Sequence, residues 1–506
     1  MTLRDTPVTG KDPTPRDPFS TEHLKKDLGR RSARAGVVTV SAQVAKLLLQ
    51  LVSVALLARL LTPADFGVYA MVAVFTGFIG RFRDLGLSAA TVQRAEVDHS
   101  HASTLFWVNV AGGLILMVVG FAIAPLVATF YGVPALTPIT LALSATFLFA
   151  GFSAQHIALL RRQMRFTSLA YVEVGAKACG IVAAIAIALT GGSYWALVVQ
   201  AIVTAMTEMI ICTWLSGWRP GRWQMSADVR EMLRFGGTLT AASMMNYFSR
   251  NFDNMVVGRF AGATQLGIYS KAYALLLMPV QQINGPIAAV AIPALARLQD
   301  QPSEYRRYYL KIVEIIAYAS MPLAVLLGVL SHEVVLILLG PQWDEAAVIF
   351  QILSLYVVVQ NVAVTTGWVM QSLGRATRLL KWQTAHALIY VIACLIGVRW
   401  GAVGVAMVTT AQGLLTMLPA MWVAYRGSPV TMRDVLLALF KPALVALALF
   451  VVTLGVHQLV HGQPVGIRLA AVLGAAVAVA GTVLLLVGPV RRDVQALVGM
   501  FRRVRT

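Results

Sequence analysis

Arg59-Leu60-Leu61-Thr62-Pro63-Ala64-Asp65-Phe66-Gly67-Val68-Tyr69 returns later in the chain as Arg259-Phe260-Ala261-Gly262-Ala263-Thr264-Gln265-Leu266-Gly267-Ile268-Tyr269. The arginine, glycine and tyrosine recur in register. The apolar segments before the two stretches also match, with Gln43, Lys46, Gln50 and Ser53 opposite Ser243, Asn246, Arg250 and Asp253. Both sets are spaced by three, four and three residues, so each forms one polar stripe along a helix. A polar stripe on an otherwise apolar helix, present twice, predicts a two-lobed transporter with a wet central cavity.

The composition is that of a membrane protein. Of the 506 residues, 58% are hydrophobic and 12% are charged, whereas a soluble protein is roughly a quarter charged. Apolar runs of twenty or more residues recur along almost the whole chain, which predicts an all-α polytopic protein. A net charge of +19 would suggest nucleic acid as the partner of a soluble protein. Here the basic residues lie in short loops between apolar runs, so orientation in the membrane explains them better and we expect no nucleic acid.

About fourteen spans are predicted, each with roughly the twenty residues that cross the hydrocarbon core. The stretch 331–344 is ambiguous, because it either extends the ninth span or lies in the interface. The predicted spans are 35–58, 67–90, 102–128, 135–159, 168–190, 193–215, 232–257, 267–293, 308–330, 345–372, 379–398, 402–425, 435–456 and 467–488.

The basic residues set the predicted orientation. With the N-terminus inside, most of the 41 Lys and Arg residues fall in inner segments, as the positive-inside rule requires. The outer loops hold Arg59, Arg259, Arg399 and Arg468. Six more bases fall within spans: Lys46, Arg81, Arg83, Lys177, Arg250 and Lys271. Both termini of this multi-pass membrane protein are therefore expected in the cytoplasm.

The spans divide as six, six and two. We expect a disordered basic tail at 1–34, one lobe at 35–230 and a second lobe at 231–427. The remainder, 428–506, is expected to hold a peripheral helix pair and a basic tail. Because six is even, both lobes enter from the same side, so the repeat is parallel and its axis lies along the membrane normal.

No catalytic motif stands out. The chain shows no ATP-binding loop, no metal-ligand spacing and no nucleophile elbow, so we expect no enzyme activity, no cofactor and no metal site. Cys179, Cys212 and Cys394 all lie within apolar spans and are expected to pack as free thiols. Without an ATP-binding loop, transport must use an ion gradient, the membrane potential or a partner.

Charged residues inside the spans are the informative set, because each costs about 2.5–3.5 kcal/mol at the bilayer centre. Lys46 lies near mid-span with no acid one turn away, which favours a place on the cavity wall together with Gln43 and Gln50. Glu173 and Lys177 are spaced for a local ion pair. Some of the others have equally plausible structural roles: snorkelling or pairing for Arg81, Arg83 and Asp84, and interfacial anchoring for Lys271.

The seventh span carries a second informative group. Arg250 and Asp253 lie one turn apart and either pair structurally or serve transport, with Asn246 and Asn254 beside them. Glu208, in the sixth span, has no local basic partner and could carry a proton. The repeated arginine, at Arg59 and Arg259, is expected to cap a helix or contact a headgroup. The repeated glycine is expected to allow close packing or a special backbone angle.

Several of these stretches resemble Wzx-type polysaccharide exporters. The resemblance lies in Ala58 to Tyr69 followed by Asp84-Leu85-Gly86-Leu87-Ser88-Ala89-Ala90, in Arg250-Asn251-Phe252-Asp253-Asn254 through Gly258-Arg259-Phe260, in Tyr269-Ser270-Lys271-Ala272-Tyr273, and in Gly285-Pro286 through Pro293-Ala294-Leu295-Ala296-Arg297-Leu298-Gln299. It covers about residues 30–430 and points to the branch similar to colanic-acid exporters, within the multidrug/oligosaccharidyl-lipid/polysaccharide superfamily.

The resemblance implies a flippase for exopolysaccharide or lipopolysaccharide biosynthesis. Such proteins lie in the bacterial inner membrane and move undecaprenyl-diphosphate-linked oligosaccharides across it by alternating access, with a cationic cavity and coupling to an ion gradient. It makes Lys46, Arg81, Arg83, Arg250, Arg259 and Lys271 candidates for substrate binding, with Gln43, Gln50 and Asn246 suited to sugar hydroxyls. Asp84, Glu208 and Asp253 are the candidates for coupling to a proton or sodium ion. Membrane lipid, a polysaccharide polymerase and the export machinery are the expected partners.

Two other classes stay open. A multidrug-type antiporter of the same superfamily should carry acidic cavity residues, yet here the intramembrane bases outnumber the acids Asp84, Glu173, Glu208 and Asp253. A membrane-embedded polysaccharide polymerase or ligase typically carries a large outer loop with paired Arg or His, and the outer loops of this chain are too short to build one.

Cysteine labelling in a Cys-free background tests the orientation. A cysteine at Gly262 should react with a membrane-impermeant reagent in intact cells, because this turn is expected outside. A cysteine at Gly221 should not react, because this linker is expected inside. The reverse pattern would overturn the topology.

Overall fold

The computed structural model describes residues 28–82, 91–92, 98–223 and 227–486. These residues form helices, and no strand occurs among them, so the predicted all-α class is confirmed. Arg83 and Asp84, residues 1–27 of the predicted basic tail and the chain beyond 486 lie outside the described part.

The helices follow one another with short connections. Their bounds are α2 Leu28–Leu60, α3 Pro63–Ile79, α5 His99–Tyr131, α6 Leu136–Arg162, α7 Phe166–Leu189, α8 Trp195–Ser216, α9 Ala227–Arg297, α10 Pro302–Val329, α11 Ser331–Leu338, α12 Asp344–Ser372, α13 Ala376–Gly397, α14 Gly401–Tyr425, α15 Met432–Leu459 and α16 Val465–Leu486. The ambiguous stretch 331–344 forms the short helix α11 and the single turn η2 (Pro341–Trp343).

Within the described residues, 11 helices are long and apolar enough to cross a membrane, or up to 12 if a bent pair in α9 counts as one span. The helical backbone is broken at two glycines. Gly262 adopts φ 86° inside α9, and Gly401 adopts φ 68° between α13 and α14. A φ in this range suits glycine, which has no Cβ atom to clash. The count of fourteen stays a prediction.

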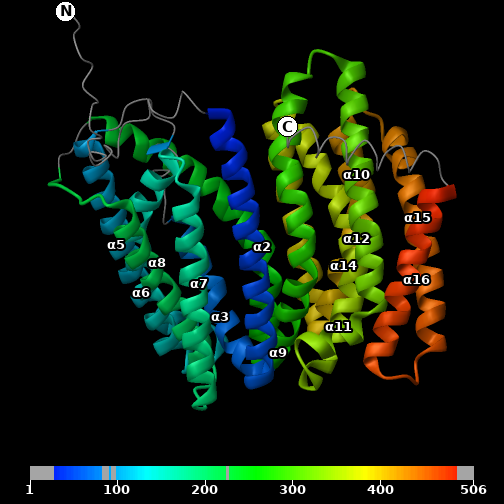
Figure 1. Ribbon diagram of the computed structural model, residues 1–506, viewed down its shortest axis with the longest axis horizontal. Coiled ribbons are helices and arrows are strands. Elements are labelled where there is room, and N and C mark those ends of the chain that lie inside the picture. Colours follow the sequence, from blue (N-terminus) through cyan, green and yellow to red (C-terminus); the bar gives the residue numbers. More distant parts are fainter. Residues whose placement is uncertain (1–27, 83–90, 93–97, 224–226, 487–506) are drawn as a thin grey trace, which may run out of the picture.

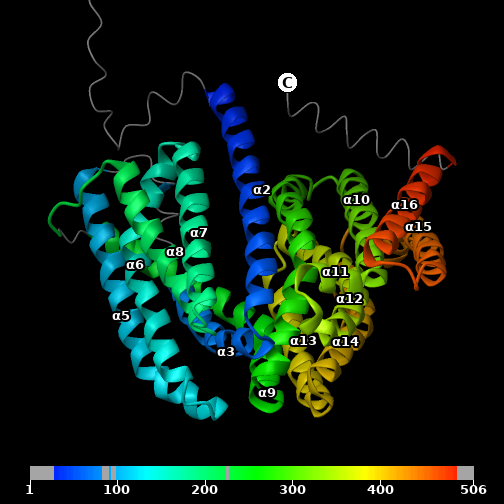
Figure 2. The ribbon, with the colours of Figure 1, turned by 60° about the horizontal axis from the view of Figure 1, so that its bottom comes forward.

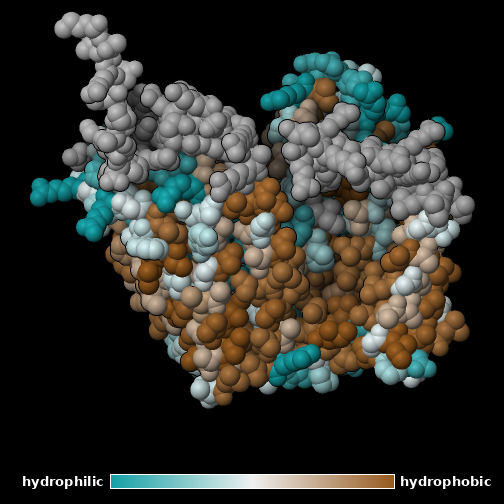
Figure 3. Space-filling view, in the orientation of Figure 1, coloured by the Kyte–Doolittle hydropathy of each residue, from teal (hydrophilic) through white to brown (hydrophobic). Residues whose placement is uncertain are grey.

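The surface agrees with a membrane setting. Apolar side chains cover the middle of the molecule, and hydrophilic side chains gather towards its two ends (Figure 3). Large apolar side chains such as Leu415, Trp214 and Val182 are exposed, which suits contact with lipid tails.

The helices form two groups with α2 between them. Helices α5 to α8 lie on one side and α10 to α16 on the other (Figure 1). In a view turned by 60°, the two groups meet where α3 crosses α9. They separate towards the other end of the molecule, where α2 begins (Figure 2). The hollow between the groups also shows on the surface (Figure 3). The molecule is therefore closed at the α3–α9 end, which we call the seal.

The seal is built from the repeated stretch. A Cβ atom on Gly67 would lie 1.7 Å from the carbonyl oxygen of Ala263, and one on Gly267 would lie 1.8 Å from that of Pro63. Each copy of the repeat thus packs its glycine against the backbone of the other copy. Of the two roles predicted for the repeated glycine, Gly67 and Gly267 serve close packing. The positive φ in this stretch occurs at Gly262, which is not the repeated glycine.

Local sequence fixes the first half of the seal. Thr62 caps α3 by accepting from the backbone N–H of Asp65, while the Asp65 carboxylate accepts from the N–H of Thr62 at 2.9 Å. Pro63 occupies the first turn, where its missing N–H costs nothing. This capping box sets the direction in which α3 leaves the turn and so brings Gly67 to Ala263.

The stretch around η2 closes the end of α2. Trp343 Nε1 donates to the carbonyl oxygen of Ala58 at 2.9 Å, and Arg59 Nη2 donates to that of Ile337 at 3.0 Å. Carbonyls at a helix end have no partner within the helix, so Trp343 satisfies one of them. Arg59 therefore binds a backbone carbonyl of the other helix group rather than capping its own helix.

A buried ion cluster fastens the C-terminal helix pair. Glu333 of α11 is fully buried, and its Oε1 accepts from Arg468 Nη1 of α16 at 2.8 Å. His457 Nε2 of α15 lies 3.1 Å from the same oxygen. The pair expected to be peripheral is thus tied by charge to a helix that borders the seal.

Alanine substitution tests the seal. In a helix, Gly→Ala is normally favourable by about 0.5–1 kcal/mol, but Gly67→Ala and Gly267→Ala place a methyl group on backbone atoms of the opposite copy. We expect both variants to open the seal. A cysteine probe introduced as Gln50→Cys should then react with a thiol reagent that is added at the sealed end of the molecule. Gly112→Ala and Gly285→Ala are the controls, because a Cβ on either glycine meets nothing within 4 Å. An unreactive probe in both seal variants would contradict the assignment.

Candidate functional site

A cavity of about 850 Å³ lies between α2 and the helices α9, α12, α13 and α14. Gln50 is its member from α2, and Arg250, Tyr356 and Tyr390 are among its members from α9, α12 and α13. Such a volume is in the range of small-molecule sites. We call this space the central cavity.

Amides and aromatic rings dominate the lining. Among the described residues that line the central cavity, Arg250 is the permanently charged one, and none is acidic. Amide side chains both donate and accept hydrogen bonds, so this lining suits a ligand rich in hydroxyl groups. The amides are Gln50, Asn251, Asn254, Gln281, Gln282, Gln360, Gln371 and Gln383, and the aromatic residues are Tyr273, Tyr356, Trp368, Trp382 and Tyr390.

Arg250 faces the cavity, and Asp253 is hidden one turn further along α9. Asp253 is fully buried, and its Oδ2 accepts from the Tyr269 hydroxyl at 2.8 Å. Its Oδ1 has no hydrogen-bond partner within the described part of the chain. Tyr273 and Tyr390 lie close enough to interact electrostatically with this carboxyl group. In this conformation Asp253 is therefore buried beside Tyr269 and is not among the residues that line the cavity.

The predicted stripe of α2 lies between the two helix groups. Gln43 Nε2 lies 3.5 Å from Gln282 Oε1 on α9, and Gln50 lines the cavity. Lys46 makes an ion pair with Glu173 of α7. The partner that local spacing suggested for Glu173 was Lys177, and the structure shows Lys46 in its place.

The Lys46–Glu173 pair is only partly buried, with side chains 27% and 40% exposed. Such a pair gains a modest amount of energy, because water screens it. It also neutralises both groups within the membrane, where an isolated charge is costly. Lys46 is therefore held at low cost and remains open to exchange its partner.

Lys46 and Gln43 are not among the lining residues of the central cavity, and the following predicted site residues also lie apart from it. Arg81 is exposed, with its guanidinium 5.0 Å from the ring centre of Tyr247. Lys271 Nζ lies 4.2 Å from the ring centre of Phe66 in the seal, a cation–π contact. Arg259 is exposed and lies 5.8 Å from the ring centre of Phe260. Glu208 is half-buried on α8.

Three candidates have no described side chain: Arg83, Asp84 and Asn246. Asn284 of α9 donates from Nδ2 to Asn361 Oδ1 at 2.6 Å. It therefore bridges α9 and α12 rather than lining the cavity.

Sequence reasoning missed the contribution of α12 and α13. Gln360, Trp368 and Gln371 line the cavity from α12, and Trp382, Gln383 and His386 line it from α13. These residues carry no permanent charge and have no counterpart in the repeated stripe. Gln360, Trp368 and Gln371 are separated by eight and three residues, and Trp382 and Gln383 come four and three residues before His386. Each set therefore lies on one side of its helix, and this signal could have found them.

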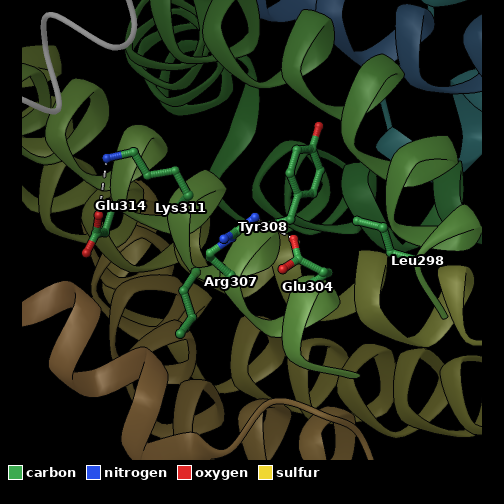
Figure 4. Close-up of a pocket in the computed structure, with 7 residues that line it drawn as sticks. Leu298, Glu304, Arg307, Tyr308, Lys311 and Glu314 are labelled. Carbon is green, nitrogen blue, oxygen red and sulfur yellow. Dashed lines mark hydrogen bonds and ion pairs between the residues drawn. The ribbon is translucent and has the colours of Figure 1, made fainter. Parts of the chain in front are cut away.

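A second pocket, of about 500 Å³, lies at the start of α10. Its charged side chains point to one another: Arg307 pairs with Glu304, and Lys311 lies 3.7 Å from Glu314 (Figure 4). These local pairs neutralise the pocket, so the central cavity is the stronger candidate site.

Known proteins resemble most of the chain. The model of the family described as polysaccharide biosynthesis protein matches residues 56–348. The Escherichia coli (strain K12) lipopolysaccharide biosynthesis protein WzxC is 26% identical over 82% of this chain and 85% of its own length. The Bacillus subtilis (strain 168) teichuronic acid biosynthesis protein TuaB is also 26% identical, over 81% of this chain and 85% of its own length.

Solved structures share the fold. An inward closed conformation of the lipid II flippase MurJ superposes with a TM-score of 0.67 at 12% identity, covering 89% of this chain and 98% of that one. An inward-facing multidrug transporter of the MATE family superposes with a TM-score of 0.57 at 15% identity, covering 75% and 94%. Because the family match extends over more than half of the chain, the protein belongs to the polysaccharide biosynthesis protein family, and its resemblance to Wzx-type exporters is confirmed.

Proposed function

We propose that this protein flips undecaprenyl-diphosphate-linked oligosaccharides across a bacterial inner membrane by alternating access. The observation that carries the proposal is a central cavity between α2 and the helices α9, α12, α13 and α14, lined by amides and Arg250. It lies in a molecule whose two helix groups join at the seal and lie apart at the other end. The names of WzxC and TuaB, both proteins of polysaccharide biosynthesis, support a glycan substrate. Both termini are proposed to lie in the cytoplasm, so that the cavity opens inwards in this conformation.

The substrate head needs positive charge. A lipid diphosphate carries two to three negative charges and cannot enter hydrocarbon unaided, and Arg or Lys in a wet cleft offsets the loss of its hydration. Arg250 offers a cation on the α9 wall of the cavity. On α2, Lys46 lies one turn from Gln50 and is held by Glu173. We propose that the diphosphate displaces Glu173 and binds between Lys46 and Arg250.

Coupling to an ion is proposed at Asp253. A fully buried carboxylate without a basic partner is costly, so this carboxyl group is stable when it carries a proton or a cation. The Tyr269 hydroxyl fixes one oxygen and leaves the other without a hydrogen bond. Arg250 lies one turn away on the cavity wall, so a change of charge at Asp253 is felt by the proposed diphosphate site. Glu208 and Asp84 remain the other proposed coupling residues.

An ion-coupled multidrug antiporter is the second candidate, favoured by the fold shared with the MATE transporter. Its cationic drugs would need acidic groups on the cavity wall. The described lining residues include none, which favours the anionic glycolipid.

Three variants test the role of Lys46. Lys46→Ala should abolish export at normal membrane abundance, because a lost charge-assisted hydrogen bond weakens diphosphate binding roughly 10- to 100-fold. Lys46→Arg should keep export. Glu173→Gln is the matched variant, because it breaks the same ion pair but leaves the Lys46 charge. Mass spectrometry of lipid-linked sugars should show accumulation only in Lys46→Ala. Equal losses of protein in Lys46→Ala and Glu173→Gln would make the pair structural.

Asp253→Asn tests the coupling. The amide oxygen still accepts from Tyr269, so we expect normal abundance, but the side chain can no longer exchange a proton or hold a cation. Gradient-driven flipping in proteoliposomes should therefore fall to the rate measured without a gradient. Asp300→Asn is the control, because Asp300 is exposed in a loop. Wild-type stimulation by the gradient in Asp253→Asn would remove Asp253 from the mechanism.

A further inference from the structure

One wall of the central cavity has a composition of its own. Six amide, aromatic and imidazole side chains lie there among aliphatic residues such as Val364 and Leu380: Gln360, Trp368 and Gln371 on α12 and Trp382, Gln383 and His386 on α13. We call these six residues the amide–aromatic wall. It carries no carboxylate and no Lys or Arg, although Arg250 lines the same cavity from α9. A ligand that bridges Arg250 and this wall needs one anionic part and one uncharged polar part.

The wall is held in place from behind. The Gln412 amide on α14 lies 2.9 Å from His386 Nε2, and the ring of Trp382 lies 6.2 Å from that of His386. Side chains positioned in this way present fixed polar groups and a fixed aromatic face, which lowers the entropy lost when a ligand binds. A cavity lining over which the substrate only passes would not need side chains fixed by such contacts.

Hydrogen-bonding capacity on the wall is not used up inside the protein. Gln360 Oε1 is buried and has no hydrogen-bond partner among the described residues, which is costly for an amide oxygen. Gln383 is exposed to the cavity, and Gln371 is likewise exposed. Amides donate and accept at once, as sugar hydroxyls do. Tryptophan offers an apolar face against which the C–H face of a sugar ring packs.

We propose that the amide–aromatic wall binds uncharged sugar rings next to the diphosphate and thereby selects the glycan. This inference rests on the proposed function, because it takes the diphosphate to lie at Arg250. The first sugar is bonded directly to the diphosphate, so a diphosphate at Arg250 holds this sugar in the cavity that the wall also lines. A lipid tail is a poor occupant, since it would leave the amides without partners.

Binding of two lipids to the purified full-length protein in detergent tests the proposal by native mass spectrometry. The probes are undecaprenyl diphosphate and the lipid-linked oligosaccharide that accumulates in a deletion strain. Trp382→Ala and Gln383→Ala should weaken binding of the glycosylated lipid roughly tenfold, which corresponds to about 1.4 kcal/mol. Both should leave the affinity for undecaprenyl diphosphate unchanged. Arg250→Ala should weaken the binding of both lipids.

Two controls match the variants. Trp422→Ala removes a tryptophan that is 59% exposed on α14 outside the cavity, and Gln351→Ala removes an exposed amide of α12 outside it. Both should bind each lipid as the wild type does. Equal losses for both lipids in Trp382→Ala and Gln383→Ala, or no loss for either, would overturn the role of the wall while leaving the flippase proposal standing. A wild-type protein that binds neither lipid would overturn both.

Discussion

A charge in hydrocarbon must have a partner or water, and this constraint decides where the polar side chains of the bundle lie. Lys46 of α2, which has no acid one turn away in the sequence, pairs with Glu173 of α7. Glu333 receives Arg468 and lies beside His457, each from a different helix. Asp253 has a tyrosine as its partner instead of a base. Of these three buried or half-buried acids, Asp253 is therefore the one whose charge is least compensated.

The same constraint separates the seal from the cavity. At the seal, backbone packs on backbone at Gly67 and Gly267, and Trp343 satisfies a carbonyl at the end of α2. A continuous apolar core joins the two helix groups there, with Phe66, Leu266 and Trp343 among its buried members. Further from the seal, α2 carries its polar stripe, and the two helix groups separate where amide side chains line the cavity. The same helices therefore carry two interfaces in succession. One is apolar and excludes water, and the other is polar and admits it.

Periodicity and repetition in the sequence predicted the class, the stripe of α2 and the importance of the repeated glycines. The repeat could not reveal that each glycine packs against the other copy, because that contact joins residues far apart in the chain. It also could not assign Glu173 to Lys46, since local spacing offered Lys177. The amide–aromatic wall escaped because its residues are uncharged and occur in one repeat. Which side chains of different helices meet depends on the angles at which the helices pack, and these angles cannot be read from one stretch of sequence.

Helix α11 has neighbours on two sides. Its Ile337 carbonyl accepts from Arg59 at the end of α2, and its Glu333 holds α15 and α16. A movement that separates α2 from α11 is therefore passed on to helices that face lipid. Such a movement alters the cross-section that the protein occupies in one leaflet, and the work of displacing lipid depends on bilayer thickness and lateral tension. The properties of the surrounding membrane then affect the free-energy difference between the conformations of the protein.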